Sequence, residues 1–113
     1  MATRLRVATS IVSYPEGRAA LAAARRARRL DAGAYSRALD DFEATQAELL
    51  GVGIDEPLAR HAGDLAEELK LRGYDAVHLA TALALGADTT LVTCDKELAQ
   101  AAIGKGCGVA PAT

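Results

Sequence analysis

Three acidic residues stand at positions where they could bind a metal ion together. Glu16 follows the first segment that reads as a strand, Asp75 opens a strongly apolar segment, and Asp95 comes just after a β-branched run. Clustered carboxylates raise one another's pKa unless a cation lies among them, so such a group usually implies Mg²⁺ or Mn²⁺. A site of this kind can activate water for cleavage of a phosphodiester bond.

The same three positions also have a simpler interpretation. Each acid lies near the expected start of a helix, where a carboxylate interacts favourably with the helix dipole. The chain has 15 acidic residues, so three well-placed ones arise easily. Position alone therefore leaves both interpretations open.

The elements that must position these acids alternate between strand and helix. Short β-branched or apolar runs predict strands, and apolar residues at helical spacing predict helices. We expect strands at 5–9, 51–54, 89–93 and 107–110, and helices at 13–29, 34–50, 55–71, from 74, and at 96–103. Ser13 and Glu16 predict a capping box at the start of the first helix. This alternation predicts an α/β domain with a short parallel sheet, whose sites lie at the carboxyl ends of the strands.

Composition sets the broad class of the protein. The 113 residues suit one domain, and a chain that is 50% hydrophobic and 25% charged is not disordered. The net charge of −2 does not favour nucleic-acid binding, although an enzyme that grips phosphates through a metal can be acidic. We therefore expect a single globular domain, 1–113.

The cysteines and the apolar segments indicate the compartment. Cys94 and Cys107 resemble neither a zinc ligand set nor a disulfide framework, so we expect two buried, reduced thiols. No segment has the roughly 18 uninterrupted apolar residues of a membrane span, and the N-terminus lacks the apolar core of a signal peptide. We expect a soluble, cytoplasmic protein.

Two motifs in the second half resemble the PIN-domain family. YDAVHLATAL (74–83) precedes TLVTCDKELAQAA (90–102), as the family's Asp-Ala-x-His-Leu-Ala-Thr-Ala helix precedes an apolar strand ending in Thr-x-Asp. VATSIVSYPEGRAAL (7–21) resembles the family's second strand and the helix that carries its catalytic glutamate. The resemblance implies a PIN-like three-layer α/β/α fold and a Mg²⁺-dependent endoribonuclease of the VapC toxin type.

The resemblance also implies roles for single residues. Glu16, Asp75 and Asp95 match three catalytic acids of the family that bind the metal, Mg²⁺ or Mn²⁺. Thr93 matches the threonine before the last aspartate, whose hydroxyl would support the site from behind the ligands. These four residues form the expected active site.

Other polar residues near the motifs have two interpretations. His78 lies one turn after Asp75, so it either faces the site or is a hydrogen-bonded core histidine. Glu97 would add a peripheral acid or lie in solvent. The acids at 64, 67 and 68 are expected to form a solvated helix face.

Arginines concentrate on and after the first expected helix. Arg18, Arg25 and Arg29 are separated by seven and four positions, so we expect them to share one face. That face either contacts RNA phosphates or a partner's carboxylates, or is an ordinary exposed surface. The VapC resemblance implies an RNA substrate of the tRNA or rRNA class, a cognate antitoxin protein and a homodimer.

One part of the family pattern has no counterpart in this chain. PIN domains of this type begin with a central strand ending in Asp-x-Ser, whose aspartate is another metal ligand, whereas MATRLRVATS aligns with the second strand. No residue before Glu16 is acidic, and Asp31 is a poor substitute because it follows the first helix. We expect an N-terminally truncated domain; a genuine fragment, or a chain that rearranges or self-associates, also fits.

The absent strand bears on stability and on function. Each buried backbone group left unpaired costs about 1–3 kcal/mol against a total stability of about 5–15 kcal/mol, so we expect a marginal domain. Catalysis would be impaired by the absent aspartate. The alternative functions are a catalytically inactive PIN-like module that binds an antitoxin or RNA, and an unrelated small α/β domain whose acids are helix caps.

Overall fold

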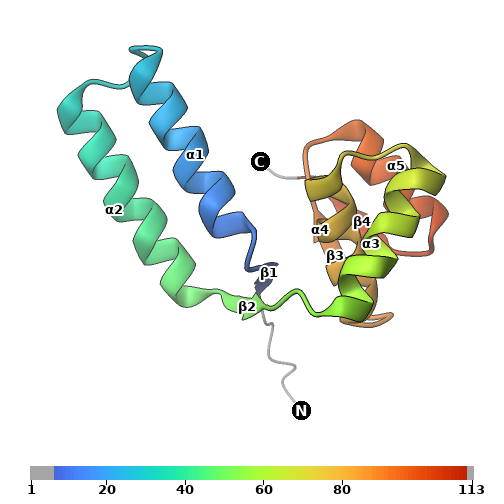
Figure 1. The fold of residues 1–113 in the computed structure, drawn as a ribbon. Helices are drawn as coiled ribbons and strands as arrows, with labels where there is room; N and C mark the ends of the chain where they lie inside the picture. Colours follow the sequence, from blue (N-terminus) through green and yellow to red (C-terminus); the bar gives the residue numbers. More distant parts are fainter. Residues whose placement is uncertain (1–6, 112–113) are drawn as a thin grey trace. The chain divides into compact units, whose positions relative to one another are not determined.

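The computed structural model describes residues 7–111. The chain divides into two compact units between Val52 and Gly53, and each unit is described by itself (Figure 1). The elements alternate along the chain in this order: β1 (Ala8–Ser10), α1 (Ser13–Arg26), α2 (Ala32–Glu48), β2 (Leu50–Val52), α3 (Glu56–Leu69), α4 (Gly73–Ala84), β3 (Thr90–Val92), α5 (Lys96–Gly104) and β4 (Gly108–Ala110).

Each expected strand and helix has a counterpart in residues 7–111, which confirms the α/β class. The first two residues of the expected strand at 5–9 lie outside the described residues. All described strand pairing is parallel, as predicted, and it forms two sheets of two strands, β1 with β2 and β3 with β4. None of the described helices combines the length and the apolar character needed to cross a membrane.

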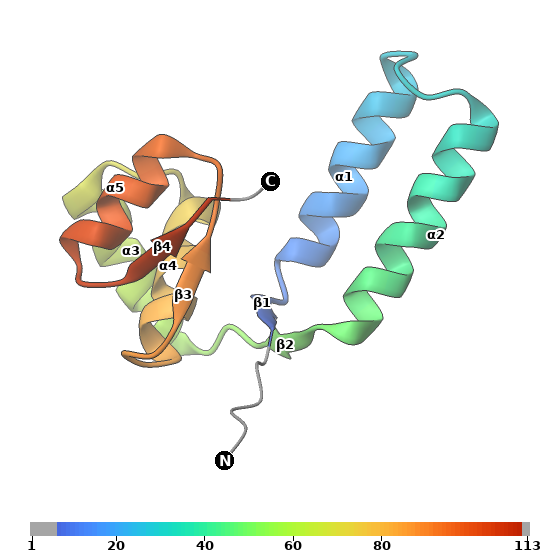
Figure 2. The ribbon, with the colours of Figure 1, turned by 180° about the vertical axis from the view of Figure 1, so that it is seen from behind.

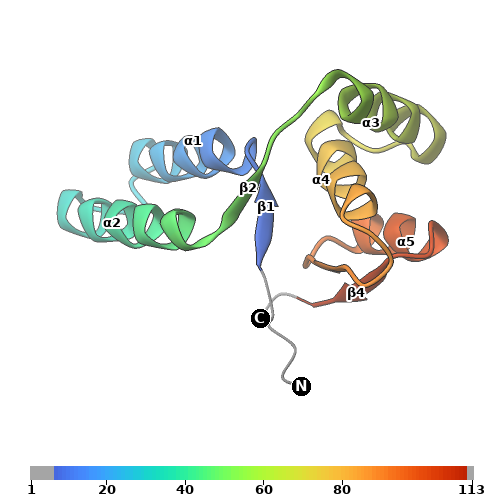
Figure 3. The same ribbon diagram turned by 90° about the horizontal axis from the view of Figure 1, so that it is seen from below.

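The N-terminal unit is a pair of helices set on a two-stranded sheet. Figures 2 and 3 show α1 and α2 side by side, connecting the parallel strands β1 and β2. The helices meet where Gly17 lies against the ring of Phe42, which in turn stacks on Tyr14 with ring centroids 5.7 Å apart. Neither helix contains a buried residue.

The start of α1 differs from the prediction. The N-cap is Val12, and no side chain caps the helix, so the expected capping box of Ser13 and Glu16 is wrong. A residue that caps a helix with its side chain usually has an extended backbone and stands just before the helix. Ser13 does not stand there, because it is the first residue of α1 and Val12 before it already has helical backbone angles (φ −67°, ψ −19°). The Ser13 hydroxyl oxygen is buried and has no hydrogen-bond partner among the described residues.

The end of α1 also comes earlier than predicted. Arg28 adopts a left-handed conformation (φ 59°), its N–H donates to the Arg25 carbonyl, and the Arg29 N–H donates to the Ala24 carbonyl. This is the Schellman ending of a helix, which usually has glycine at the left-handed position. The expectation that Arg29 shares a helix face with Arg25 is therefore wrong, because the helix ends at Arg26.

The C-terminal unit holds the hydrophobic core. The buried apolar residues of residues 7–111 all belong to this unit: Ala62, Leu65, Ala76, Leu79, Ala80, Ala82, Leu98, Ala102 and Cys107. Many of them are alanines, whose small side chains let α3 and α4 pack closely. The α4 helix is the centre of this core, since five of its residues are buried.

The two cysteines differ in environment. Cys107 is buried beside Thr89 and Gly108, as predicted, whereas Cys94 is exposed, so the expectation of two buried thiols is half wrong. Cys94 lies in the short connection between β3 and α5, outside any helix or strand. Both thiols are free.

Candidate metal centre at the N-termini of α4 and α5

Asp75 lies in the first turn of α4, at a sharp turn of the chain. Helix α3 ends at Leu69, its C-cap Lys70 adopts a left-handed conformation (φ 57°), and α4 begins after the extended Arg72. A carboxylate in the first helical turn interacts favourably with the helix dipole. The side chain of Asp75 is 22% exposed, so it is largely enclosed but open to solvent on one side.

Asp95 is the N-cap of α5. Its Oδ1 accepts a hydrogen bond from the Leu98 N–H at 3.0 Å. Its own N–H donates to the Thr93 hydroxyl at 3.1 Å, and the Thr93 N–H donates to the Ala110 carbonyl of β4 at 3.1 Å. The conformation of Asp95 is thus fixed on both sides, and its Oδ2 remains for other contacts.

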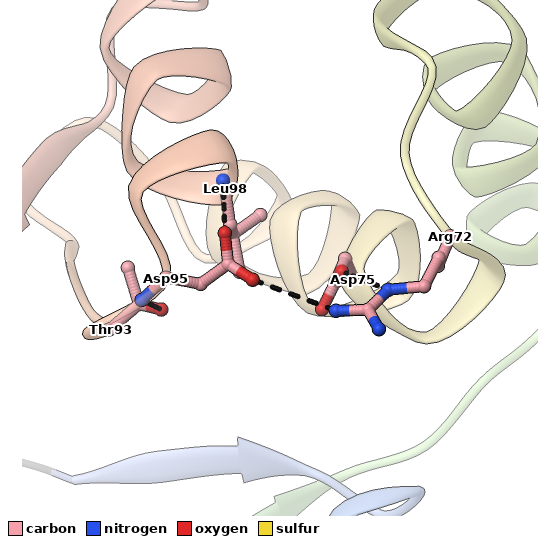
Figure 4. Close-up of polar contacts among 5 residues, drawn as sticks. All are labelled: Arg72, Asp75, Thr93, Asp95 and Leu98. Atoms are coloured by element: carbon pink, nitrogen blue, oxygen red, sulfur yellow. Dashed lines mark hydrogen bonds and ion pairs between the residues drawn. The ribbon is translucent and has the colours of Figure 1, made fainter.

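A single guanidinium group joins the two carboxylates. The Arg72 Nε lies 3.3 Å from Asp75 Oδ2, and one terminal nitrogen of Arg72 lies 3.6 Å from Asp95 Oδ2. Figure 4 draws both contacts as dashed lines. The two aspartates that the sequence singled out therefore converge on one cationic group. A hollow of about 570 Å³ opens here, lined by Lys70, Leu71, Arg72, Asp75, Asp95, Lys96 and Glu97.

The charges around this hollow are balanced. The lining contains three acidic and three basic side chains. Lysines and an arginine beside the carboxylates reduce their mutual repulsion, and they also provide positive charge for an anionic ligand such as a phosphate. Glu97, expected as a peripheral acid, lies on this lining.

The two aspartates suit a divalent cation. Hard cations such as Mg²⁺ take oxygen ligands and are often held by one or two carboxylates, with water and substrate phosphates completing the shell. Asp75 and Asp95 already share one positively charged group, so their Oδ2 atoms face a common point. Among the described residues, no three His, Cys, Asp or Glu side chains together form a ligand set.

The remaining predicted residues lie outside this pair. Glu16 is in the first turn of α1, in the N-terminal unit, and its place in the site stays a prediction. His78 is half-buried in α4. Sequence reasoning missed Arg72, although its position three residues before Asp75, the spacing of neighbours on a helix, was a usable signal.

The arginines of α1 are partly engaged within their own unit. Arg18 donates to the Tyr14 hydroxyl at 2.8 Å and lies 3.5 Å from Glu43, which accepts from the same hydroxyl. The hydrogen bond that Arg18 donates to the Tyr14 hydroxyl raises the pKa of the Arg18 guanidinium above its ordinary value. Arg25 donates to the Leu30 carbonyl at the end of the helix.

Known proteins resemble this chain over most of its length. A family model described as PIN domain matches residues 2–104. Two proteins of Mycobacterium tuberculosis, Ribonuclease VapC45 of strain CDC 1551 and Ribonuclease VapC49 of strain H37Rv, are each 45% identical to the chain over 106 residues. The match covers 92% of this chain and 73% of each relative. No solved structure matches significantly. The chain therefore belongs to the PIN-domain family and, within it, to the VapC type of ribonuclease.

Proposed function

We propose that this protein is a Mg²⁺-dependent endoribonuclease of a toxin–antitoxin system, which hydrolyses phosphodiester bonds in RNA. The observation that carries the proposal is the convergence of Asp75 and Asp95 on one cationic group. Its similarity to two proteins named ribonucleases supports the choice of RNA as substrate.

In this proposal Asp75 and Asp95 hold the metal, and Glu16 is a third ligand by its match to the family. The chemistry supplied by bound Mg²⁺, or Mn²⁺ in its place, would be activation of water and stabilisation of charge on the phosphate. Thr93 fixes the backbone at Asp95 through its hydroxyl. The N-termini of α4 and α5 add partial positive charge, which favours a phosphate group nearby.

The partners follow from the same family. We propose a structured RNA of the tRNA or rRNA class as substrate, a cognate antitoxin as inhibitor, a homodimer as the assembly, and the cytoplasm as the compartment. Arg26, Arg28 and Arg29 are exposed at the end of α1 and could bind RNA phosphates.

The direct test is RNA cleavage with Mg²⁺ or with EDTA, comparing the wild type with Asp75→Asn and Asp95→Asn. Both changes remove a charge while keeping the shape, and Asn remains a good N-cap at position 95. Glu56→Gln is the matched control, because Glu56 is an exposed first-turn acid of α3 that pairs with Arg60. Cleavage that survives EDTA, or that Asp75→Asn leaves unchanged, would refute the mechanism.

A second candidate is a binding module without catalysis. The observation that favours it is the pair α1 and α2, in which no residue is buried, so their surfaces are available to an antitoxin or RNA. This candidate predicts RNA or antitoxin binding with no cleavage in Mg²⁺ or Mn²⁺, and with affinity unaffected by Asp75→Asn.

A further inference from the structure

We propose that Arg72 is an internal counter-cation of the metal site, which holds Asp75 and Asp95 together and competes with the divalent ion for them. The inference rests on the proposed function and concerns how strongly that same site binds its metal. It assigns a positioning role to a residue that is neither acidic nor a metal ligand.

Arg72 and a metal ion compete for the same two carboxylate oxygens, Asp75 Oδ2 and Asp95 Oδ2. Asp95 Oδ1 is engaged with the Leu98 N–H, at 3.0 Å. Its Oδ2 is the atom that faces Arg72, at 3.6 Å, and the contacting atom of Asp75 is also Oδ2, at 3.3 Å. A cation that binds these two Oδ2 atoms at about 2.0–2.6 Å therefore takes the position of the guanidinium.

The Arg72 side chain is free to move into solvent. Its side chain is 83% exposed, whereas those of Asp75 and Asp95 are 22% and 38% exposed. Both contacts are longer than the 2.7–2.9 Å typical of a strong charge-assisted hydrogen bond. An exposed ion pair contributes little to stability, so displacement of Arg72 into solvent is inexpensive.

The carboxylates of Asp75 and Asp95 need a cation beside them when no metal is bound. Two carboxylates that share a site repel each other unless a positive charge lies between them. Arg72 is held next to them because it is the N-cap of α4, three residues before Asp75. The arginine thus keeps the pair assembled in the metal-free protein and weakens metal binding in return.

The test is Mn²⁺ titration of the full chain by calorimetry, with the wild type, Arg72→Gln, Arg72→Lys and Arg60→Gln. Arg72→Gln removes the competing charge and is expected to tighten Mn²⁺ binding about two- to tenfold. Arg72→Lys keeps the charge and should stay near the wild type. Arg60→Gln is the control for net charge, because Arg60 is an exposed arginine of the same unit that pairs with Glu56, and it should change little.

A second readout is thermal unfolding followed by circular dichroism. Without metal, Arg72→Gln should unfold about 2–4 °C below the wild type, and added Mn²⁺ should raise its midpoint more than it raises that of the wild type. One outcome would overturn the role of Arg72 alone: Arg72→Gln binds Mn²⁺ no more tightly than Arg60→Gln does, while Asp75→Asn abolishes binding. If Asp75→Asn binds Mn²⁺ as tightly as the wild type does, the metal site is overturned and the proposed function with it.

Discussion

The Thr93 hydroxyl accepts a hydrogen bond from the backbone N–H of Asp95 at 3.1 Å. This bond lies in the short connection between β3 and α5, and it sets the direction in which Asp95 begins the helix. Thr93→Val keeps the shape of the side chain but leaves that N–H without its acceptor. We expect a loss of about 0.5–1.5 kcal/mol in the free energy of unfolding and weaker Mn²⁺ binding.

Thr93→Ser is the matched variant, because it keeps the hydroxyl and loses only a methyl group. It should bind Mn²⁺ as the wild type does. Equal Mn²⁺ affinity in Thr93→Val and Thr93→Ser would show that the hydroxyl does not support the site. Urea unfolding and calorimetry measure both quantities.

Gly17 sets the contact between α1 and α2. A Cβ built on Gly17 overlaps the ring of Phe42, so Gly17→Ala should force the helices apart and lower the free energy of unfolding by about 1–3 kcal/mol. Gly63→Ala is the control, since Gly63 lies inside α3 and, apart from the local helix backbone, no described atom lies within 4 Å of the added Cβ. This variant should be more stable than the wild type by up to about 1 kcal/mol. If denaturant unfolding shows the same change in free energy for both variants, Gly17 does not set the contact between α1 and α2.

Two helices are followed by a left-handed residue of a type that rarely adopts this conformation. Lys70 and Arg28 have φ values of 57° and 59°, which glycine adopts without steric strain. Lys70→Gly and Arg28→Gly should therefore stabilise the protein, each by up to about 1 kcal/mol. Lys96→Gly, at the start of α5 where φ is not positive, should destabilise it by a similar amount. Thermal unfolding of the three variants checks the signs.

These helix ends also show what the sequence could not predict. The helix that became α3 was predicted from the start signals Asp55 and Pro57, and α4 from a run that is apolar on nearly every side. Both helices could therefore be predicted from the sequence. The position at which a helix stops depends on one residue's backbone angles. Lysine or arginine at such a position gives no signal, whereas glycine would have given one. For this reason α1 was predicted three residues too long.

Part of the candidate site could also be predicted from the sequence, and part could not. Asp95 was identified because it follows a β-branched strand, and its neighbour Thr93 because of the family motif. Arg72 was missed because a charged residue at a helix start is usually solvated, and only the turn at Lys70 brings it over both carboxylates. The predictions of a buried Cys94 and of a Ser13 capping box were wrong for a related reason. Both depend on where one residue lies relative to the start of a helix.

Asp95 combines a structural and a proposed chemical role, and two substitutions separate them. Asp95→Ala removes both the cap to Leu98 and the charge toward Arg72, so it should lose about 1 kcal/mol of stability and Mn²⁺ binding as well. Asp95→Asn keeps an oxygen that can accept from the Leu98 N–H but removes the negative charge. Its free energy of unfolding should stay within about 0.5 kcal/mol of the wild type while Mn²⁺ binding and RNA cleavage are lost. Paired unfolding and titration experiments decide the matter: if Asp95→Asn binds Mn²⁺ as tightly as the wild type, this aspartate is a helix cap and not a metal ligand.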